Sequence, residues 1–122
     1  MSKRRVVVTG LGMVSPLGLT VQETWSHLLA GKSGVSRVES FDVSDYSAQI
    51  SASVKGFDPS EYMPLKDARK LDTFVQYGFV AAKEAIHDAG LDIAADNLDL
   101  SRVGIAIGSG IGGLPGIEKA YS

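Results

Sequence analysis

Cysteine is absent from the 122-residue chain. Without a thiol, these residues can form no disulfide, no thiolate metal site and no cysteine nucleophile. Histidine is also scarce, with two in the whole sequence. No histidine and carboxylate cluster has the spacing of a metal site, and we expect His27 and His87 to be structural or solvated. We therefore assign no catalytic residue, no metal ligand and no cofactor within the chain.

Long apolar runs and an excess of one charge are missing as well. No segment approaches the ~20 apolar residues that span a bilayer, and the first residues lack the pattern of a signal peptide. The formal net charge is −2, so no global field attracts nucleic acid or an anionic membrane. We expect a cytoplasmic protein with neither of these partners.

The sequence instead alternates strand patterns with helix patterns. Apolar or alternating runs predict three strands, at residues 5–9, 49–54 and 102–107. Amphipathic periodicity predicts three helices, at residues 20–31, at 68–89 and from Ile117 onward. The order is therefore β-α-β-α-β-α, which favours an α/β layered sheet whose chemistry lies beyond the carboxyl ends of the strands.

The first predicted helix has a clear start signal and an apolar stripe. Thr20 and Glu23 form a capping box, in which each side chain reaches the other residue's backbone N–H. Trp25, Leu28 and Leu29 follow at helical spacing and are expected to face a core.

The most unusual segment is glycine-rich and follows the last predicted strand. It contains four glycines in six residues, Gly108-Ser109-Gly110-Ile111-Gly112-Gly113. Such a run marks a place where backbone approaches another group closely. Its letters also match the dinucleotide fingerprint Gly108-x-Gly110-x-x-Gly113. A dinucleotide-binding α/β domain is therefore an alternative interpretation, although the fingerprint also needs an acidic residue about 20 positions further on, which would stand beyond residue 122.

Three basic residues, Lys66, Arg69 and Lys70, are spaced to form one patch if they lie on a helix. Asp67 and Asp72 interrupt the positive charge nearby. From spacing alone, a solvated surface is favoured, and a dock for an acidic partner is the second interpretation.

Taken together, several segments resemble the β-ketoacyl-[acyl-carrier-protein] synthases, with the closest likeness to the elongating synthase II type. The segments that carry the resemblance lie at residues 4–12, 15–18, 25–31, 33–34, 41–42, 69–78 and 108–113. The resemblance covers essentially the whole chain in order. It implies a thiolase-like layered α/β fold, of which residues 1–122 are the first, incomplete part of the N-terminal half, ending inside or just before a helix.

The resemblance also implies an activity. These enzymes elongate fatty acyl chains by decarboxylative Claisen condensation of an acyl thioester with malonyl-acyl-carrier protein, usually as homodimers. A cysteine at a helix N-terminus takes the acyl group, and two histidines and a lysine assist decarboxylation. In the family these groups lie downstream of Ser122, which agrees with the absence of cysteine here. The fragment alone is therefore expected to be inactive.

Two sets of residues carry over from the family by position. Ile111, flanked by Gly110 and Gly112, matches the position that gates the acyl pocket. Lys66, Arg69 and Lys70 match basic positions that contact acidic acyl carrier protein, so the resemblance favours the docking interpretation. Leu65 stands where some relatives carry another basic residue. A third interpretation, a non-catalytic module that binds carrier protein, uses the same basic patch.

Overall fold

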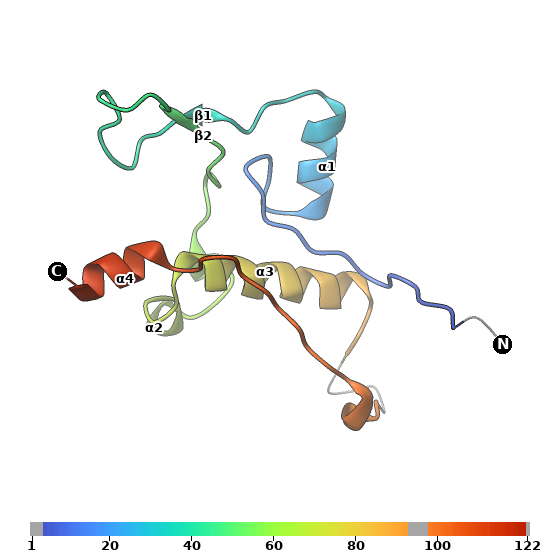
Figure 1. The fold of residues 1–122 in the computed structure, drawn as a ribbon. Coiled ribbons are helices and arrows are strands. Elements are labelled where there is room, and N and C mark those ends of the chain that lie inside the picture. Colours follow the sequence, from blue (N-terminus) through green and yellow to red (C-terminus); the bar gives the residue numbers. More distant parts are fainter. Residues whose placement is uncertain (1–3, 93–97, 122) are drawn as a thin grey trace.

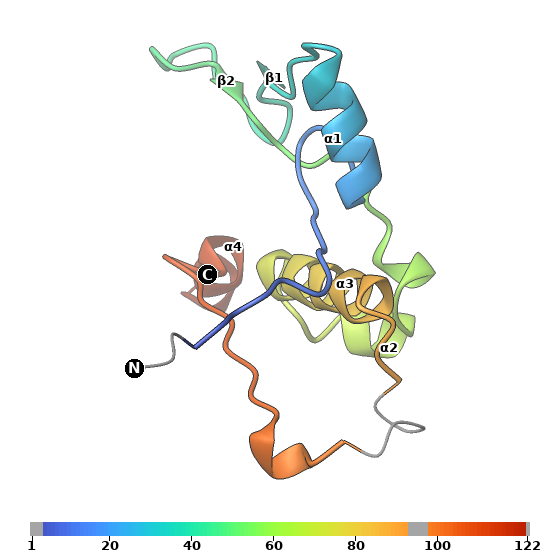
Figure 2. The ribbon, with the colours of Figure 1, turned by 90° about the vertical axis from the view of Figure 1, so that its right-hand side faces the viewer.

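The computed structural model describes residues 4–92 and 98–121 of the chain. Its helices are α1 (Val21–Leu29), α2 (Leu65–Ala68), α3 (Thr73–Asp88) and α4 (Leu114–Tyr121), with short 3-10 helices at Pro59–Glu61 and Leu100–Arg102. Its strands are β1 (Ser36–Arg37) and β2 (Ile50–Ser51). Figures 1 and 2 show α3 as the central element, with α1 and the small sheet on one side and α2 and α4 near its N-terminal half.

The predicted sheet is largely not formed, which corrects the expected β-α-β-α-β-α order. In the described part of the chain, the sheet consists of β1 and β2, paired antiparallel with Ser36 opposite Ser51. Of the strand expected at residues 49–54, β2 keeps two residues. Residues 5–9 and 103–107 are extended but belong to no strand. A parallel strand obtains its hydrogen bonds from neighbours distant in sequence, and an apolar run does not supply that neighbour.

The two extended segments instead lie against α3. A Cβ built on Gly12 would overlap the backbone carbonyl of Ala81, so this glycine allows the first segment to approach the helix closely. The second segment runs along α3, where Ile107 lies 3.8 Å from the Cβ position of Gly78. Both segments remain open on their other sides, because Val6 is 86% exposed and Ile105 is 86% exposed.

Helix α1 begins as the capping box predicts, with one difference. The backbone N–H of Glu23 donates to Thr20 Oγ1 at 3.2 Å. The Glu23 carboxylate reaches back to the N–H of Leu19 at 2.9 Å, one residue before the expected partner. The core expected for Trp25, Leu28 and Leu29 is wrong, because all three side chains are exposed. Trp25 lines a shallow hollow together with Glu84, His87 and Asp88 of α3, but it is not buried there.

Carboxylates on α3 tie the first loop of the chain to the helix. Glu84 accepts hydrogen bonds from the backbone N–H groups of Met13, at 2.8 Å, and Val21, at 2.9 Å. Asp88 accepts one from the N–H of Leu11 at 2.9 Å. These bonds involve charged acceptors, which are among the stronger hydrogen bonds in proteins.

The buried core is small and lies between α2 and α3. Met63, Ala68 and Val80 form one buried cluster, against which Phe57 and Tyr62 pack. Within the described residues, none of the helices has the length and hydrophobicity needed to cross a membrane.

Candidate functional site

The glycine-rich segment joins the extended segment that runs along α3 to the start of α4. Gly112 has a φ of +79°, a left-handed conformation that favours glycine. Around Gly108 and Gly110, a Cβ would meet no atom within 4 Å. Ile111 lies between Gly110 and Gly112, and its side chain is 76% exposed. The structure therefore presents Ile111 on a turn with open space before it.

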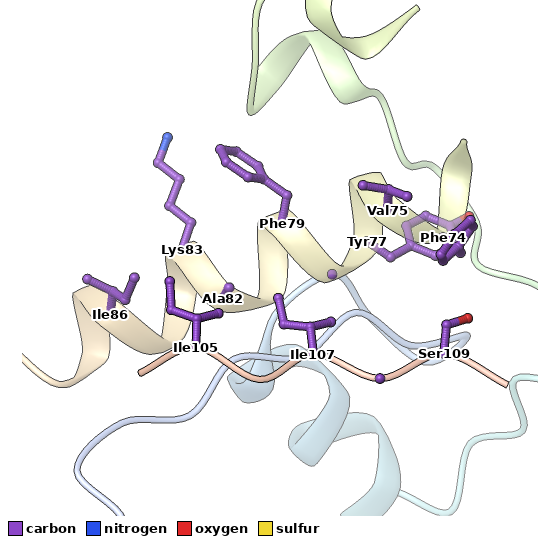
Figure 3. Close-up of a pocket in the computed structure, with 12 residues that line it drawn as sticks. Phe74, Val75, Tyr77, Phe79, Ala82, Lys83, Ile86, Ile105, Ile107 and Ser109 are labelled. Carbon is purple, nitrogen blue, oxygen red and sulfur yellow. The ribbon is translucent and has the colours of Figure 1, made fainter. Parts of the chain in front are cut away.

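An apolar groove of about 790 Å³ leads toward this turn. One wall is α3, with Phe74, Phe79 and Ile86 among its side chains, and the other is the extended segment with Ile105 and Ile107 (Figure 3). The lining ends at Ser109, so Ile111 lies just beyond the groove. Its walls are complementary to a hydrocarbon surface.

Tyr77, which also lines this groove, is partly buried. Tyr77 packs edge-on against Phe57, with ring centroids 4.8 Å apart, and Phe57 stacks on Tyr62 at 5.5 Å. Burial raises the pKa of Tyr77, and burial, reinforced by Glu61, raises the pKa of Tyr62. Both phenols are therefore protonated at neutral pH and add no charge to this region.

The three basic residues are all exposed, but they do not share one helix as the spacing predicted. Lys66 lies on α2, which ends at Ala68, whereas Arg69 and Lys70 lie in the turn that precedes α3. The helix expected to begin at residue 68 begins at Thr73, because the chain turns at Asp72.

This basic turn is fixed from beneath by a buried amide. Gln76 Nε2 donates to the carbonyl oxygen of Ala68 at 2.9 Å and to that of Leu71 at 3.0 Å. Gln76 is 9% exposed and Ala68 is 4% exposed. The backbone that carries Arg69 and Lys70 is thus held in place although their side chains are free in solvent.

In residues 4–92 and 98–121, no group of three histidines or carboxylates could hold a metal ion. His27 is structural, because its Nδ1 donates to the Leu17 carbonyl oxygen at 2.5 Å. His87 is exposed on α3.

Sequence reasoning missed two contacts that shape this region. One is the pair of hydrogen bonds to Glu84, whose polar-face position on the helix gave no sign of its partners. The other places the Asp72 carboxylate against Gly113 and Gly116. The excess of glycine at residues 108–116 was the available signal, but it does not name the residue that approaches.

Comparisons with known proteins identify relatives along the whole chain. The sequence model of the family described as "Beta-ketoacyl synthase, N-terminal domain" matches residues 3–122. The "3-oxoacyl-[acyl-carrier-protein] synthase 2" of Vibrio cholerae is 53% identical over 121 residues, which are 99% of this chain and 29% of that protein. The protein of the same name in Coxiella burnetii is 54% identical over 121 residues, and that of Staphylococcus aureus is 42% identical over 118.

A solved structure supports the same grouping. The chain resembles "The ishigamide ketosynthase/chain length factor" with a TM-score of 0.64 and 35% sequence identity, over 75% of this chain and 23% of that one. The thiolase-like α/β class predicted from the sequence is thereby confirmed, although its sheet is not assembled within these residues. The comparisons do not favour a dinucleotide-binding domain. The chain spans about 29% of the length of the relatives named above.

Proposed function

Because this chain belongs to the beta-ketoacyl synthase family through its N-terminal domain, we propose that it forms the amino-terminal part of a β-ketoacyl-[acyl-carrier-protein] synthase II. The observation that carries the proposal is identity of 53–54% to synthases of that name across 99–100% of the chain. The complete enzyme would join an acyl thioester to malonyl-acyl-carrier protein with loss of carbon dioxide.

The reacting groups would come from outside these residues, which contain no cysteine. A thiolate is the nucleophile such acyl transfer requires, and a helix N-terminus lowers its pKa. Backbone N–H groups would stabilise the oxyanion that forms on attack. Residues 1–122 would thus be an incomplete domain that contributes to binding and selection. We propose that the complete enzyme is a cytoplasmic homodimer.

Ile111 is proposed to set the depth of the acyl pocket. Its support is positional likeness to the family's gate, together with its place on a turn at the end of an apolar groove. With Gly110 and Gly112 on either side, one branched side chain would limit the hydrocarbon chain while the adjacent backbone leaves space.

Lys66, Arg69 and Lys70 are proposed to dock acidic acyl carrier protein. Their exposure and the fixed backbone beneath them support this role. Charges at the edge of an interface mainly speed encounter and set orientation. We expect this patch to contribute to carrier-protein recognition and not to the chemical step.

The test is a condensation assay on the purified full-length protein, with acyl- and malonyl-carrier protein as substrates. We expect a 3-oxoacyl product. In the double variant Lys66→Glu/Arg69→Glu, we expect the KM for carrier-bound substrate to rise about tenfold, equivalent to about 1.4 kcal/mol. The kcat with an acyl group on a small thiol should be unchanged.

Lys32→Glu/Lys55→Glu is the matched control, since it reverses two exposed lysines outside the patch. An equal rise in KM for this control would contradict the docking role. A full-length protein that forms no 3-oxoacyl product from any acyl chain length would contradict the proposed function itself.

A further inference from the structure

Asp72 occupies the N-cap position of α3 but does not cap that helix. Its backbone is extended, with φ −62° and ψ 152°, as at other N-caps, yet its side chain accepts no capping hydrogen bond. Aspartate is among the residues preferred at this position because its carboxylate normally accepts from the first turn of its own helix. The carboxylate of Asp72 is therefore directed to a different part of the molecule.

That part is the beginning of α4. A Cβ built on Gly113 would overlap Asp72 Oδ2, and one built on Gly116 would lie 2.6 Å from Oδ1. The two carboxylate oxygens thus occupy space that a larger residue at either position would fill. A negative charge is favoured there, because the first turn of a helix carries the positive end of the helix dipole.

Phe74, in the first turn of α3, packs against Gly112, the residue that precedes Gly113. A Cβ on Gly112 would lie 3.2 Å from Phe74 Cζ and 3.5 Å from Cε1, so the ring edge lies directly against the Gly112 backbone. Figure 3 shows Phe74 beside the Ser109 end of the glycine-rich segment. Asp72 and Phe74 therefore contact the two residues that follow Ile111.

We propose that Asp72 and Phe74 are positioning residues that hold the turn at residues 112–113, and with it Ile111, against the start of α3. By fixing that turn, they set the acyl chain length that the enzyme accepts. This inference rests on the proposed function of Ile111 as a gate. It adds a specificity-determining contact from residues that adjoin the basic patch in sequence, since Asp72 follows Lys70 by two positions.

The first test uses the full-length protein and measures amide hydrogen exchange of residues 112–117 by mass spectrometry. In Asp72→Ala, we expect exchange in this segment to quicken about tenfold, which corresponds to about 1.4 kcal/mol. Asp72→Asn, which keeps the shape and removes the charge, should have a smaller effect. Asp67→Ala is the matched control, because Asp67 is an exposed carboxylate on α2.

A double-mutant cycle shows whether Asp72 acts through the glycines. Gly116→Ala should quicken exchange in the wild-type background, because the added methyl displaces the carboxylate. In the Asp72→Ala background, the same substitution should have no such effect or should slow exchange, since alanine favours a helix over glycine. Additive effects in the two backgrounds would overturn the proposed contact.

The second readout is the ratio of kcat/KM for long and short acyl substrates. Asp72→Ala and Phe74→Ala should each change this ratio about tenfold, the lower range for one methylene group in an apolar pocket. The kcat of Asp72→Ala with the shortest acyl substrate should remain that of the wild type, because Asp72 does not line the groove.

The two proposals fail in different ways. An active wild type whose variants keep both the exchange rates and the selectivity ratio would overturn the inference and leave the proposed function intact. Faster exchange with an unchanged selectivity ratio would also overturn it, because the turn would then move without consequence for the pocket. An inactive wild type would overturn the proposed function, while the exchange cycle would still decide whether Asp72 holds the turn.

Discussion

Residues 1–122 expressed alone are expected not to fold cooperatively, because too little of their surface is buried. The chain exposes 10260 Å², whereas a compact protein of 12.9 kDa exposes about 6,300 Å². The excess is therefore about 4,000 Å². Obligate interfaces bury roughly 2,000–5,000 Å² counted over both partners, so this excess on one chain exceeds one partner's usual share, and a partner or further chain is required to cover it.

The distribution of this surface strengthens the expectation. Among the described residues, the buried hydrophobic side chains are Val43, Met63, Ala68 and Val80, and no large side chain is fully buried. Exposed apolar residues include Val6 to Val8 and the isoleucines of the second extended segment. Contiguous apolar surface of this kind leads to association or aggregation in water.

Calorimetry and sedimentation of the purified polypeptide measure this directly. We expect no cooperative heat-absorption peak, binding of a hydrophobic dye such as ANS, and self-association that increases with concentration. A folded two-state domain of this length would unfold with about 85 kcal/mol near 60 °C. A sharp, reversible transition of that size from a monomer would refute the reasoning.

Three further predictions concern the full-length protein. Ile111→Phe should lower the ratio of kcat/KM for long over short acyl substrates by about 10- to 200-fold, whereas Ile111→Leu, of equal volume, should leave this ratio nearly unchanged. Equal changes in the ratio for the two variants would contradict the role of Ile111 as a gate. Gln76→Leu should lower the free energy of unfolding by about 1–3 kcal/mol, measured from the urea midpoint, because it removes one hydrogen bond to a buried carbonyl and one to a partly buried carbonyl. An unchanged midpoint would contradict this. Burial raises the pKa of Tyr77 in the folded state. The stability that this burial contributes is therefore fully present below the unfolded pKa of about 10 and is lost as pH rises through the folded pKa. Tyr77→Phe should flatten this alkaline decline in the free energy of unfolding, and an identical stability-against-pH profile would contradict the burial argument.

Local features of the fold could be predicted from the sequence, and pairing between distant segments could not. The start of α1 followed from the chemistry of Thr20 and Glu23, whose interaction partners lie within a few residues. The strand expected at residues 5–9 failed to form because its hydrogen-bonding neighbours are not specified by its own side chains. Trp25 failed as a core residue for the same reason, since a stripe shows which face is apolar but not what covers it.

In the candidate site, too, local features could be predicted from the sequence and contacts between distant segments could not. Glycine density marked residues 108–113 as a close-approach segment, and Gly112 does adopt a left-handed conformation. That Asp72 is the residue filling the space beside Gly113 depends on how α3 and α4 cross, which no periodicity encodes. The family resemblance supplied the proposed roles of Ile111 and the basic patch, and those roles await measurement.

In the proposed enzyme, residues 1–122 select and dock substrates while the attacking thiol lies elsewhere in the protein. The direct measurement is 3-oxoacyl product formation by the full-length protein and by purified residues 1–122, each given acyl- and malonyl-carrier protein under the same conditions. We expect product from the full-length protein and none from residues 1–122. Product from residues 1–122 alone, in a preparation free of other synthases, would contradict the account.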